Sequence, residues 1–416
     1  MPEAVARPSA PSEIIDPAHY GAHGPPYEIF AELRERAPVA WCEATGFDPF
    51  WAVTSHADVV SLSRQPQLFE NAPVSFIAPK EQFGDGDMND ILHELLQMDP
   101  PEHREYRAIT SKFFTPRAIE KMRPKVAQCV DEILNRTAEL SGTPFDFVEQ
   151  VAAVMPIVVI ADMLGLPLAD RDQFFRWTNE IAAPDAFQRE PGVSPFPVAV
   201  AELSEYFSKL VEARRRRPTA DITSVIANAQ IGGAPMPDFE LYSYLALLIV
   251  GGNETTRNAI SGGLVALLEN PQEWARLQTE PSLLVPACEE ILRYTAPLVQ
   301  FARTPNRDVE VNGQSISAGE QIALFYPAAN RDPAVFDEPD RFRIDRSPNE
   351  HLAFGIGEHV CLGAHLARME LQELFGALAR RMHDAELVGA VDRNASSNVS
   401  GIKRLPVKLE LSASVS

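Results

Sequence analysis

The sequence predicts a predominantly α-helical protein with a smaller, split β portion. Apolar residues recur with helical periodicity through most of the middle of the chain, and strand-like alternation is confined to short segments. The expected helices lie at residues 103–140, 146–183, 197–216 and 238–270. No repeat of fixed period is visible, so a repeat architecture is not indicated.

The first hundred residues are expected to hold much of the irregular structure. Residues 1–25 are rich in proline and alanine and predict an N-terminal extension that covers the surface loosely. Residues 27–70 predict a helix, a short hairpin and a second helix. Residues 71–97 contain several glycines, prolines and aspartates, which predict a long irregular loop that acts as a lid over a site.

Strand character returns late in the chain. It appears only near 308–325, where Asn312-Gly313 is a pair typical of a tight hairpin turn, and in a final segment at 402–411. Length alone would allow two or three domains. Because the candidate site residues described below are spread over most of the chain, we expect residues 26–416 to form a single domain.

Composition and charge exclude several classes of protein. The chain has 416 residues, of which 45% are hydrophobic and 23% charged, as expected for a globular protein with a large core. Its formal net charge of −21 argues against nucleic-acid binding. The longest apolar run, Leu245 to Gly252, is shorter than the roughly 18 residues of a spanning helix, so no membrane anchor is expected. The absence of a signal-peptide pattern and four scattered cysteines favour a reducing, cytoplasmic location.

One stretch inverts the acidic character of the chain. Residues 101–125 hold seven lysines and arginines against three glutamates, a balance of 7 − 3 = +4. A solvated helix face explains this balance. A docking patch for an acidic electron donor explains it equally well, because charge complementarity raises the rate of encounter.

Cys361 is the strongest candidate for a chemical role. It lies in the run FGIGEHVCLG at 354–363, directly before an amphipathic helix predicted from Leu362 onward. A cysteine ligates a soft or borderline metal as the thiolate, and the positive N-terminal end of a helix stabilises that anion. The surrounding glycines allow turn conformations closed to other residues and leave room for a flat cofactor.

Three other interpretations account for part of this run. A lone cysteine in an apolar stretch is often an inert small hydrophobe. A glycine-rich loop before a helix can bind phosphate, but this spacing matches neither the dinucleotide nor the P-loop motif. A zinc site formed by His359, Cys361 and His365 is possible, yet no second pair of ligands accompanies it. None of the three explains the whole run.

A second unusual pattern interrupts the apolar helix expected at 245–268, where the sequence reads GGNETT. Gly251 and Gly252 each cost about 1 kcal/mol relative to alanine in a helix interior. The paired glycines would allow close packing against another helix. Alternatively they open a groove over a cofactor, where Glu254 and Thr255 supply a carboxylate and a hydroxyl for proton delivery.

Four motifs together resemble those of the cytochrome P450 family. The run at 354–363 matches FGxGxHxCxG, and GGNETT matches (A/G)Gx(D/E)T(T/S). Glu290 and Arg293 form ExxR, and His103 and Arg107 form HxxxR. The resemblance covers nearly the whole chain and implies the cytochrome P450 fold, in which the ExxR pair is buried and structural.

The resemblance also implies a haem b cofactor and its contacts. Cys361 would be the axial thiolate ligand of the haem iron, and Phe354 would pack near its sulfur. The basic residues expected to bind the haem propionates are His103, Arg107, Arg303 and His359. Thr255 would hydrogen-bond the oxygen that is being activated, and Glu254 would relay protons from solvent.

An apolar set of residues is expected to bind the substrate: Leu247, Val250, Gly251, Leu298, Val299, Val399 and Phe76. Ile77 and Phe83 lie with Phe76 in the predicted lid. This lining predicts a hydrophobic substrate held mainly by burial. The resemblance suggests a terpenoid, steroid or alkyl/aromatic hydrocarbon type.

The expected activity is hydroxylation of that substrate by a haem-thiolate monooxygenase that uses O2. Electrons are expected from an iron–sulfur ferredoxin and its NAD(P)H-dependent reductase on other chains, since no flavin or reductase segment is present. Two alternatives remain: a peroxide-driven peroxygenase, and a haem-binding sensor or carrier without catalytic turnover.

Overall fold

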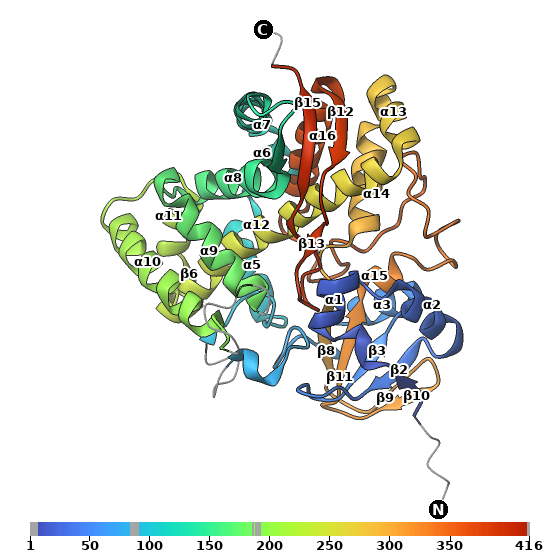
Figure 1. Cartoon of the computed structure of the whole chain (residues 1–416). Coiled ribbons are helices and arrows are strands. Elements are labelled where there is room, and N and C mark those ends of the chain that lie inside the picture. Colours follow the sequence, from blue (N-terminus) through green and yellow to red (C-terminus); the bar gives the residue numbers. More distant parts are fainter. Residues whose placement is uncertain (1–6, 84–90, 185–186, 188–192, 414–416) are drawn as a thin grey trace, which may run out of the picture.

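The computed structural model describes residues 7–83, 91–184, 187 and 193–413, and the predicted class, mostly helical with a smaller β portion, is confirmed (Figure 1). The helices are α1 (Pro17–His23), α2 (Tyr27–Arg36), α3 (His56–Ser63), α5 (Glu102–Ser111), α6 (Pro116–Glu120), α7 (Arg123–Ala138), α8 (Val154–Leu164), α9 (Arg171–Ala182), α10 (Phe196–Arg216), α11 (Ile222–Ala227), α12 (Asp238–Glu269), α13 (Pro271–Thr279), α14 (Leu284–Thr295), α15 (Tyr326–Ala329) and α16 (Ala364–Arg381). The strands are β1 (Ser9–Ala10), β2 (Val39–Cys42), β3 (Phe50–Val53), β4 (Phe69–Glu70), β5 (Pro144–Asp146), β6 (Gln230–Ile231), β7 (Ala234–Pro235), β8 (Gln300–Pro305), β9 (Val309–Val311), β10 (Gln314–Ile316), β11 (Gln321–Phe325), β12 (Met382–Leu387), β13 (Asp392–Arg393), β14 (Ile402–Arg404) and β15 (Pro406–Leu411).

The helix α12 is the axis of the helical part. Its 32 residues give a length of about 48 Å at 1.5 Å per residue. It contacts α8, α9, α10, α14 and α16, and Figure 1 shows it crossing the middle of the molecule. Side chains on all of its faces are buried, as in a helix that is apolar nearly all round. The helix predicted at 238–270 is therefore confirmed, and it is the element that other helices pack around.

Two long predicted helices are instead broken into shorter ones. The stretch at 103–140 forms α5, α6 and α7, because Pro116 and Pro124 each stand in the first turn of a new helix. The stretch at 146–183 forms α8 and α9, because Gly165 ends α8 in the left-handed conformation at φ +68°. Both stretches are helical, as the apolar periodicity predicts, and the breaks follow from proline and glycine.

A six-stranded sheet in the order β1-β2-β3-β11-β8-β4 lies beside the helical part (Figure 1). Successive residues of β2, β3 and β11 face opposite sides and belong to different cores. Ala52 and Ala323 face the core that contains Phe30 of α2, whereas Trp51 faces the core that contains Leu62 of α3. The predicted hairpin of β2 and β3 and the two helices around it are confirmed.

The prediction that strand character returns only near 308–325 and at 402–411 is wrong, because six strands lie outside both ranges: β5, β6, β7, β8, β12 and β13. β8 lies within the six-stranded sheet, paired with β11 and β4, and β12 pairs with β15. The apolar pattern does not predict β8, because Gln300 and Arg303, both polar, occupy buried positions in it. The hairpin at Asn312-Gly313 is confirmed, with φ +51° and +74° at the turn between β9 and β10. The final segment at 402–411 is confirmed as β14 and β15.

The N-terminal residues are more firmly packed than the predicted loose extension at 1–25. β1 pairs in parallel with β2, placing Ser9 opposite Trp41. Tyr20 of α1 is buried and its hydroxyl donates to the carbonyl of Ile14 at 2.9 Å. From Ser9 onward the segment is thus part of the core beneath the sheet. Among the described residues, no helix combines the length and apolar character needed to cross a membrane.

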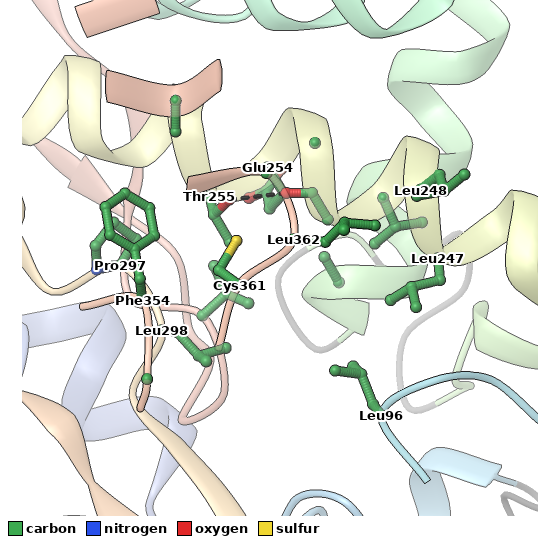
Figure 2. A pocket seen from close by; sticks show the side chains of 18 of the residues that line it. Leu96, Leu247, Leu248, Glu254, Thr255, Pro297, Leu298, Phe354, Cys361 and Leu362 are labelled. Atoms are coloured by element: carbon green, nitrogen blue, oxygen red, sulfur yellow. Dashed lines mark hydrogen bonds between the residues drawn. The ribbon is translucent and has the colours of Figure 1, made fainter. Parts of the chain in front are cut away.

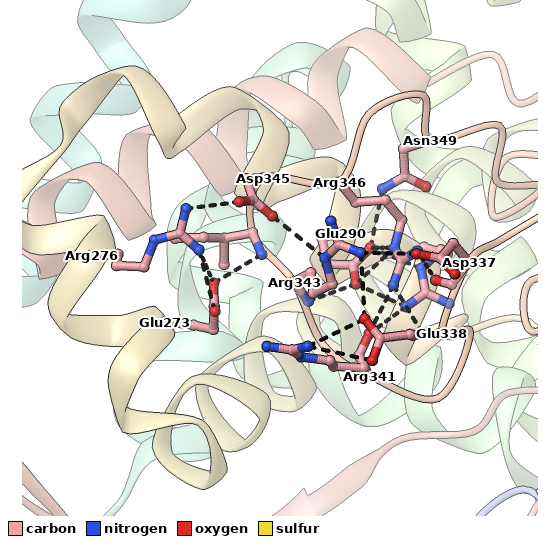
Figure 3. A network of polar contacts seen from close by, with 12 residues as sticks. Glu273, Arg276, Glu290, Asp337, Glu338, Arg341, Arg343, Asp345, Arg346 and Asn349 are labelled. Atoms are coloured by element: carbon pink, nitrogen blue, oxygen red, sulfur yellow. Dashed lines mark hydrogen bonds and ion pairs between the residues drawn. The ribbon is translucent and has the colours of Figure 1, made fainter.

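A buried carboxylate on α14, Glu290, organises the segment that follows α15 (Figure 3). Arg293 donates to it through Nε and Nη2, both at 2.8 Å, and Arg346 donates through Nε at 3.0 and 3.2 Å. The Arg343 N–H and the Asn349 amide add bonds of 2.9 and 3.2 Å. The ExxR pair is therefore buried, as expected, and its carboxylate has several donors.

The same cluster fixes the chain on its way to Cys361. Arg293 Nη1 donates to the carbonyl of Asn330 at 2.9 Å. The Asn330 side chain accepts a bond of 2.7 Å from the N–H of Leu352, two residues before Phe354. A continuous set of hydrogen bonds thus links α14 to the start of the cysteine run.

Replacing Glu290 by glutamine should lower the free energy of unfolding by about 3–5 kcal/mol, because two buried guanidinium groups lose their counter-charge. Urea unfolding followed by circular dichroism measures this loss. The matched control is Glu338→Gln, which removes an exposed carboxylate that pairs with Arg341 and Arg343. It should change stability by less than about 1 kcal/mol. Equal losses in the two variants would contradict a special role for the buried cluster.

Candidate active site

A cavity of about 310 Å³ lies between α12 and the loop that precedes α16 (Figure 2). The segment before α5, α5 itself and the start of β8 complete its walls. Most lining side chains are apolar, and Figure 2 shows Leu96 and Leu247 on the side opposite Pro297 and Phe354. Such walls bind a ligand mainly by removing it from water.

The Cys361 loop is a closed turn whose shape requires glycine. The Cys361 N–H donates to the carbonyl of Phe354 at 2.9 Å, which closes the run on itself. Gly355 and Gly357 have φ of +65° and +83°, a region that only glycine adopts readily. A Cβ atom on Gly357 would also lie 2.4 Å from the carbonyl oxygen of Ser63. The turn places the thiol on the cavity wall.

The Cys361 side chain has its accessible surface on the cavity and is otherwise enclosed by protein. Burial raises the pKa of the thiol, while the Gly363 N–H and the charges of Arg107 and Arg368 lower it. α16 begins at Ala364, so its N-terminal end lies beside the sulfur as expected. Because the net shift is upward, the protein alone favours the neutral thiol. A metal cation bound to the sulfur would favour the thiolate.

An ion pair beside the loop was missed by the sequence analysis. The Arg368 guanidinium lies over the Phe354 ring, 4.5 Å from its centroid, and donates to Glu289 at 2.8 and 2.9 Å. His351 contacts the same carboxylate at 3.1 Å. Burial alone would raise the pKa of Glu289, but His351 and Arg368 together lower it to about 2. No motif joins these residues, because they meet only through the packing of α14 against α16.

Two predicted cofactor residues, His103 of α5 and His359 of the Cys361 loop, meet at one end of the cavity. Their ring centroids are 4.1 Å apart, and neither Nε2 atom has a hydrogen-bond partner among the described residues. Burial lowers the pKa of His359 to about 2, with further lowering by His103, Arg303 and Arg107. These rings are therefore neutral near pH 7 and can donate a hydrogen bond without carrying charge.

The two predicted arginines, Arg107 and Arg303, differ in their contacts. Arg107 lines the cavity and donates to the carbonyl of Val360 at 2.6 Å, which ties α5 to the Cys361 loop. Arg303 of β8 is not among the lining residues, is 4% exposed, and donates to the carbonyl of Ala302 at 2.7 Å. Within the described part of the chain no carboxylate lies within ion-pair distance of Arg303. A buried guanidinium without a counter-ion indicates an anionic ligand nearby.

On the facing wall, α12 uses its two glycines for different purposes. A Cβ atom on Gly252 would lie 3.0 Å from Ile160 of α8, so this glycine permits close helix packing. A Cβ atom on Gly251 would meet nothing within 4 Å, so this glycine leaves space at the cavity wall. The Thr255 hydroxyl donates to the carbonyl of Gly251 at 2.9 Å. Figure 2 shows Thr255 on the wall that faces Cys361. Both explanations of the glycine pair thus hold, one for each residue.

Glu254 is held in a buried polar cluster next to Thr255. Its Oε1 accepts a hydrogen bond from Arg257 and bonds of 3.2 and 3.3 Å from Asn258 and Asn394. Oε2 has no partner among the described residues. Burial raises the pKa of Glu254, against the lowering effect of Arg257. Arg257 also donates to Asn179 of α9, so the cluster joins α12 to α9 and to the loop after β13.

Six of the seven predicted substrate residues line the cavity: Leu247, Val250, Gly251, Leu298, Val399 and Phe76. Leu298 and Val399 form an isolated antiparallel bridge. Val299 does not line it. Its side chain points into the core beneath the sheet, because successive residues of extended chain face opposite sides. Of the predicted lid, residues 84–90 and the side chain of Phe83 lie outside the described residues, and Ile77 is buried in the same core as Val299.

The zinc alternative is not supported by the side chains. His365 is exposed on α16, and the described residues contain no cluster of three His, Cys, Asp or Glu side chains placed to share a metal ion. A thiol facing a hydroxyl across the cavity, with buried cationic and imidazole groups at one end, fits the class of haem-thiolate proteins.

Comparison with known proteins identifies the family. A sequence model of the cytochrome P450 family matches residues 18–383, and the chain belongs to this family. It is 38% identical over 393 residues to a steroid C26-monooxygenase of Mycolicibacterium smegmatis, covering 92% of this chain and 90% of that protein. It is 33% identical over 389 residues to a linalool 8-monooxygenase of Pseudomonas putida, covering 92% and 95%. The structure of Mycobacterium marinum cytochrome P450 CYP268A2 in complex with pseudoionone has a TM-score of 0.89 and 32% identity, covering 97% of this chain and 100% of that one.

The protein is thus a cytochrome P450 monooxygenase, an oxidoreductase that incorporates molecular oxygen, and its cofactor is haem iron with a cysteine thiolate. The cavity residues fit this group. The iron needs a thiolate, and Cys361 faces the cavity. Two propionates need buried donors and positive charge. Arg303, which forms no ion pair with any described residue, and the Nε2 atoms of His103 and His359, which have no partner in the same part of the chain, provide them. The macrocycle needs apolar walls and a gap in α12, which Gly251 leaves.

Proposed function

We propose that this monooxygenase hydroxylates a hydrophobic small molecule of terpenoid, steroid or alkyl/aromatic type, with Cys361 as the axial ligand of the haem iron. The observation that carries the proposal is the placement of Cys361 and Thr255 on facing walls of one apolar cavity. The names of the relatives, a steroid monooxygenase and a linalool monooxygenase, support a steroid or terpene skeleton. The cytoplasmic location stays a prediction.

The residues of the chain position the substrate and hold the protons. When bound, the haem supplies the redox chemistry that activates dioxygen, with the thiolate as an electron-donating ligand. Thr255 directs its proton to the carbonyl of Gly251, so its oxygen remains able to accept a hydrogen bond in the groove. Glu254 keeps Oε1 bound to Arg257, which leaves Oε2 to hold or release a proton.

The proposed redox partner is a ferredoxin that docks on exposed cations near α5 and α6. Three of the seven basic residues at 101–125 form ion pairs: Arg104 with Glu358, Arg123 with Glu120 and Glu373, and Lys125 with Asp162. Lys112, Arg117 and Lys121 are exposed and form no ion pair with any described residue. These three charges support docking of an acidic surface better than a wholly neutralised helix face would.

The oxygen-driven reaction is favoured over the alternatives by the polar cluster on α12. A peroxygenase takes its oxygen from peroxide, which is already reduced and protonated. It therefore does not need Thr255 and a buried carboxyl beside the groove to deliver protons. A sensor or carrier needs neither these groups nor exposed cations for electron transfer. The cost of burying Glu254 and Arg257 together is better explained if the pair serves proton delivery.

Replacing Cys361 by serine should abolish the thiolate-type absorption spectrum of the reduced carbon monoxide complex, because an alcohol does not donate charge to iron as a thiolate does. Cys129→Ser is the matched control, since that thiol lies on α7 and does not line the cavity. Retention of the thiolate spectrum in the Cys361 variant would refute the ligand assignment.

Replacing Thr255 by alanine should divert at least half of the consumed oxygen to peroxide at the expense of product, because the groove loses its hydroxyl. Oxygen uptake, peroxide and product are measured together under ferredoxin-driven turnover and, separately, with added peroxide. Ser261→Ala removes a buried hydroxyl from the same helix away from the cavity and should leave coupling unchanged. Unaltered coupling in the Thr255 variant would favour the peroxygenase.

Reversing the charges of Lys112, Arg117 and Lys121 to glutamate should slow reduction by a plant-type [2Fe–2S] ferredoxin about 10-fold at low ionic strength, with a smaller difference at high salt. Stopped-flow reduction of the carbon monoxide complex measures the rate. Arg217→Glu, an exposed charge at the end of α10, is the control and should have little effect. A rate that is independent of the triple reversal would place the docking surface elsewhere.

A further inference from the structure

Two buried polar side chains interrupt the apolar wall of the cavity in the segment before α5. Gln82 is 3% exposed and Glu94 is 6% exposed, and both line the cavity. Among the described residues, the Gln82 Oε1 atom has no hydrogen-bond partner, and the Glu94 carboxyl forms no hydrogen bond. Neither side chain takes part in the haem or oxygen chemistry described above, and neither is part of a motif.

The backbone around Glu94 is fixed, so its side chain is held in place. The Glu94 N–H donates to the side chain of Gln97 at 3.1 Å. Its carbonyl accepts bonds of 2.9 and 3.3 Å from the N–H groups of Gln97 and Met98. The N–H of the preceding His93 donates to the Ser243 hydroxyl on α12 at 3.1 Å. All backbone polar groups of Glu94 are therefore satisfied, and the carboxyl is the group left available.

The carboxyl is a hydrogen-bond donor near neutral pH. Burial raises the pKa of Glu94 to about 8, and no neighbouring cation opposes this shift. A protonated carboxyl has one O–H donor and further acceptor capacity, whereas the Oε1 atom of Gln82 can only accept. The cavity wall formed by the segment before α5 therefore offers a donor and an acceptor.

The backbone that carries Glu94 contacts α12 far from the oxygen groove. Ser243, which anchors the backbone next to Glu94, precedes Thr255 by 12 residues, or about 18 Å of helix. Leu96, on the same segment, lies across the cavity from Phe354 (Figure 2). A ligand that reaches from Thr255 to Glu94 would thus present its two ends to different chemistry.

Leaving such groups unbonded is unfavourable. Each buried polar group without a partner costs about 1–3 kcal/mol. A site built to bond a hydroxyl also rejects the analogue that lacks it, because the buried groups of the protein are then left unpaired. A hydroxyl is the simplest ligand group that can accept a hydrogen bond from the Glu94 carboxyl and can equally donate one to the Gln82 Oε1 atom.

We propose that Glu94 and Gln82 bind a hydroxyl group of the substrate at the end remote from the carbon that is oxidised. The substrate class is then an alcohol on a terpene or steroid skeleton, rather than a plain hydrocarbon. This inference rests on the proposed function and names its substrate more closely. It adds a polar anchor to a site otherwise expected to bind by burial alone.

The test is a titration of the holoenzyme followed by the spin-state change of the haem absorption, with two sets of matched probes. One set is limonene, carvone and carveol, and the other is androstane, androstanone and androstanol. In at least one set the alcohol should bind about 10-fold more tightly than the hydrocarbon, the equivalent of one well-formed hydrogen bond. Absence of a preference for the alcohol in both sets overturns the proposal, and this includes a failure of all six compounds to bind.

Two variants at one position separate hydrogen bonding from packing. In Glu94→Leu the preference for the alcohol should fall to less than about 2-fold, while the hydrocarbon binds as well as before or better, since an unpaired polar group has been removed. Glu94→Gln keeps a donor and an acceptor and should retain most of the preference. Gln82→Leu should reduce it as well. An equal loss for alcohol and hydrocarbon in Glu94→Leu would indicate a packing role and overturn the proposal.

The reduced carbon monoxide spectrum of each variant distinguishes the two levels of the argument. A thiolate-type spectrum without an alcohol preference overturns the polar anchor and leaves the proposed monooxygenase in place. A wild-type protein without that spectrum overturns the proposed function itself.

Discussion

The charge cluster around Glu290 is the constraint on which the active site depends. Arg293 and Arg346 compensate one buried carboxylate, and through Arg293 the cluster holds the carbonyl of Asn330. The side chain of Asn330 then holds Leu352, at the entrance to the turn that carries Cys361. The long segment between α15 and α16 has no regular secondary structure. These polar contacts therefore hold it in place, as backbone hydrogen bonds do in a helix or a strand. The position of the thiol follows from a charge pair that never touches the cavity.

The opposite wall differs, because α12 is apolar on nearly every side and still presents polar groups to the cavity. Each of these groups has a partner on the same helix: Glu254 and Arg257 are buried together, whereas the Thr255 hydroxyl donates to the carbonyl of Gly251 at the cavity wall. Gly252 allows α8 to approach closely behind them, which keeps the helix fixed. One wall is thus an irregular loop shaped by glycine, and the other is a rigid helix. The distance between the two walls is set by packing outside the cavity.

Local patterns made much of this site predictable from the sequence. The turn at Cys361 and the GGNETT segment are each contained within ten residues, so their geometry is fixed by backbone rules that act at short range. Contacts between distant segments were not accessible in this way. Arg368 and Glu289 meet only when α14 packs on α16. Val299 faces the core beneath the sheet and not the cavity because it directly precedes β8, a strand that the apolar pattern does not predict. Glu94 gave no signal, because a buried carboxyl cannot be told from a solvated one until the chain around it is folded.

The order of strands in the six-stranded sheet bears on how the chain reaches its native state. β3 lies between β2 and β11, and Ala52 is paired with Ala323, 271 residues later. At a synthesis rate of 5–20 residues per second, the β2–β3 hairpin waits roughly 14–54 s for the strand that completes it. During that time one edge of β3 is open, although its residues are destined for the interior. The sheet that flanks the haem site consequently closes only after residue 325 has emerged, and until then the edge of β3 is available for pairing with another chain.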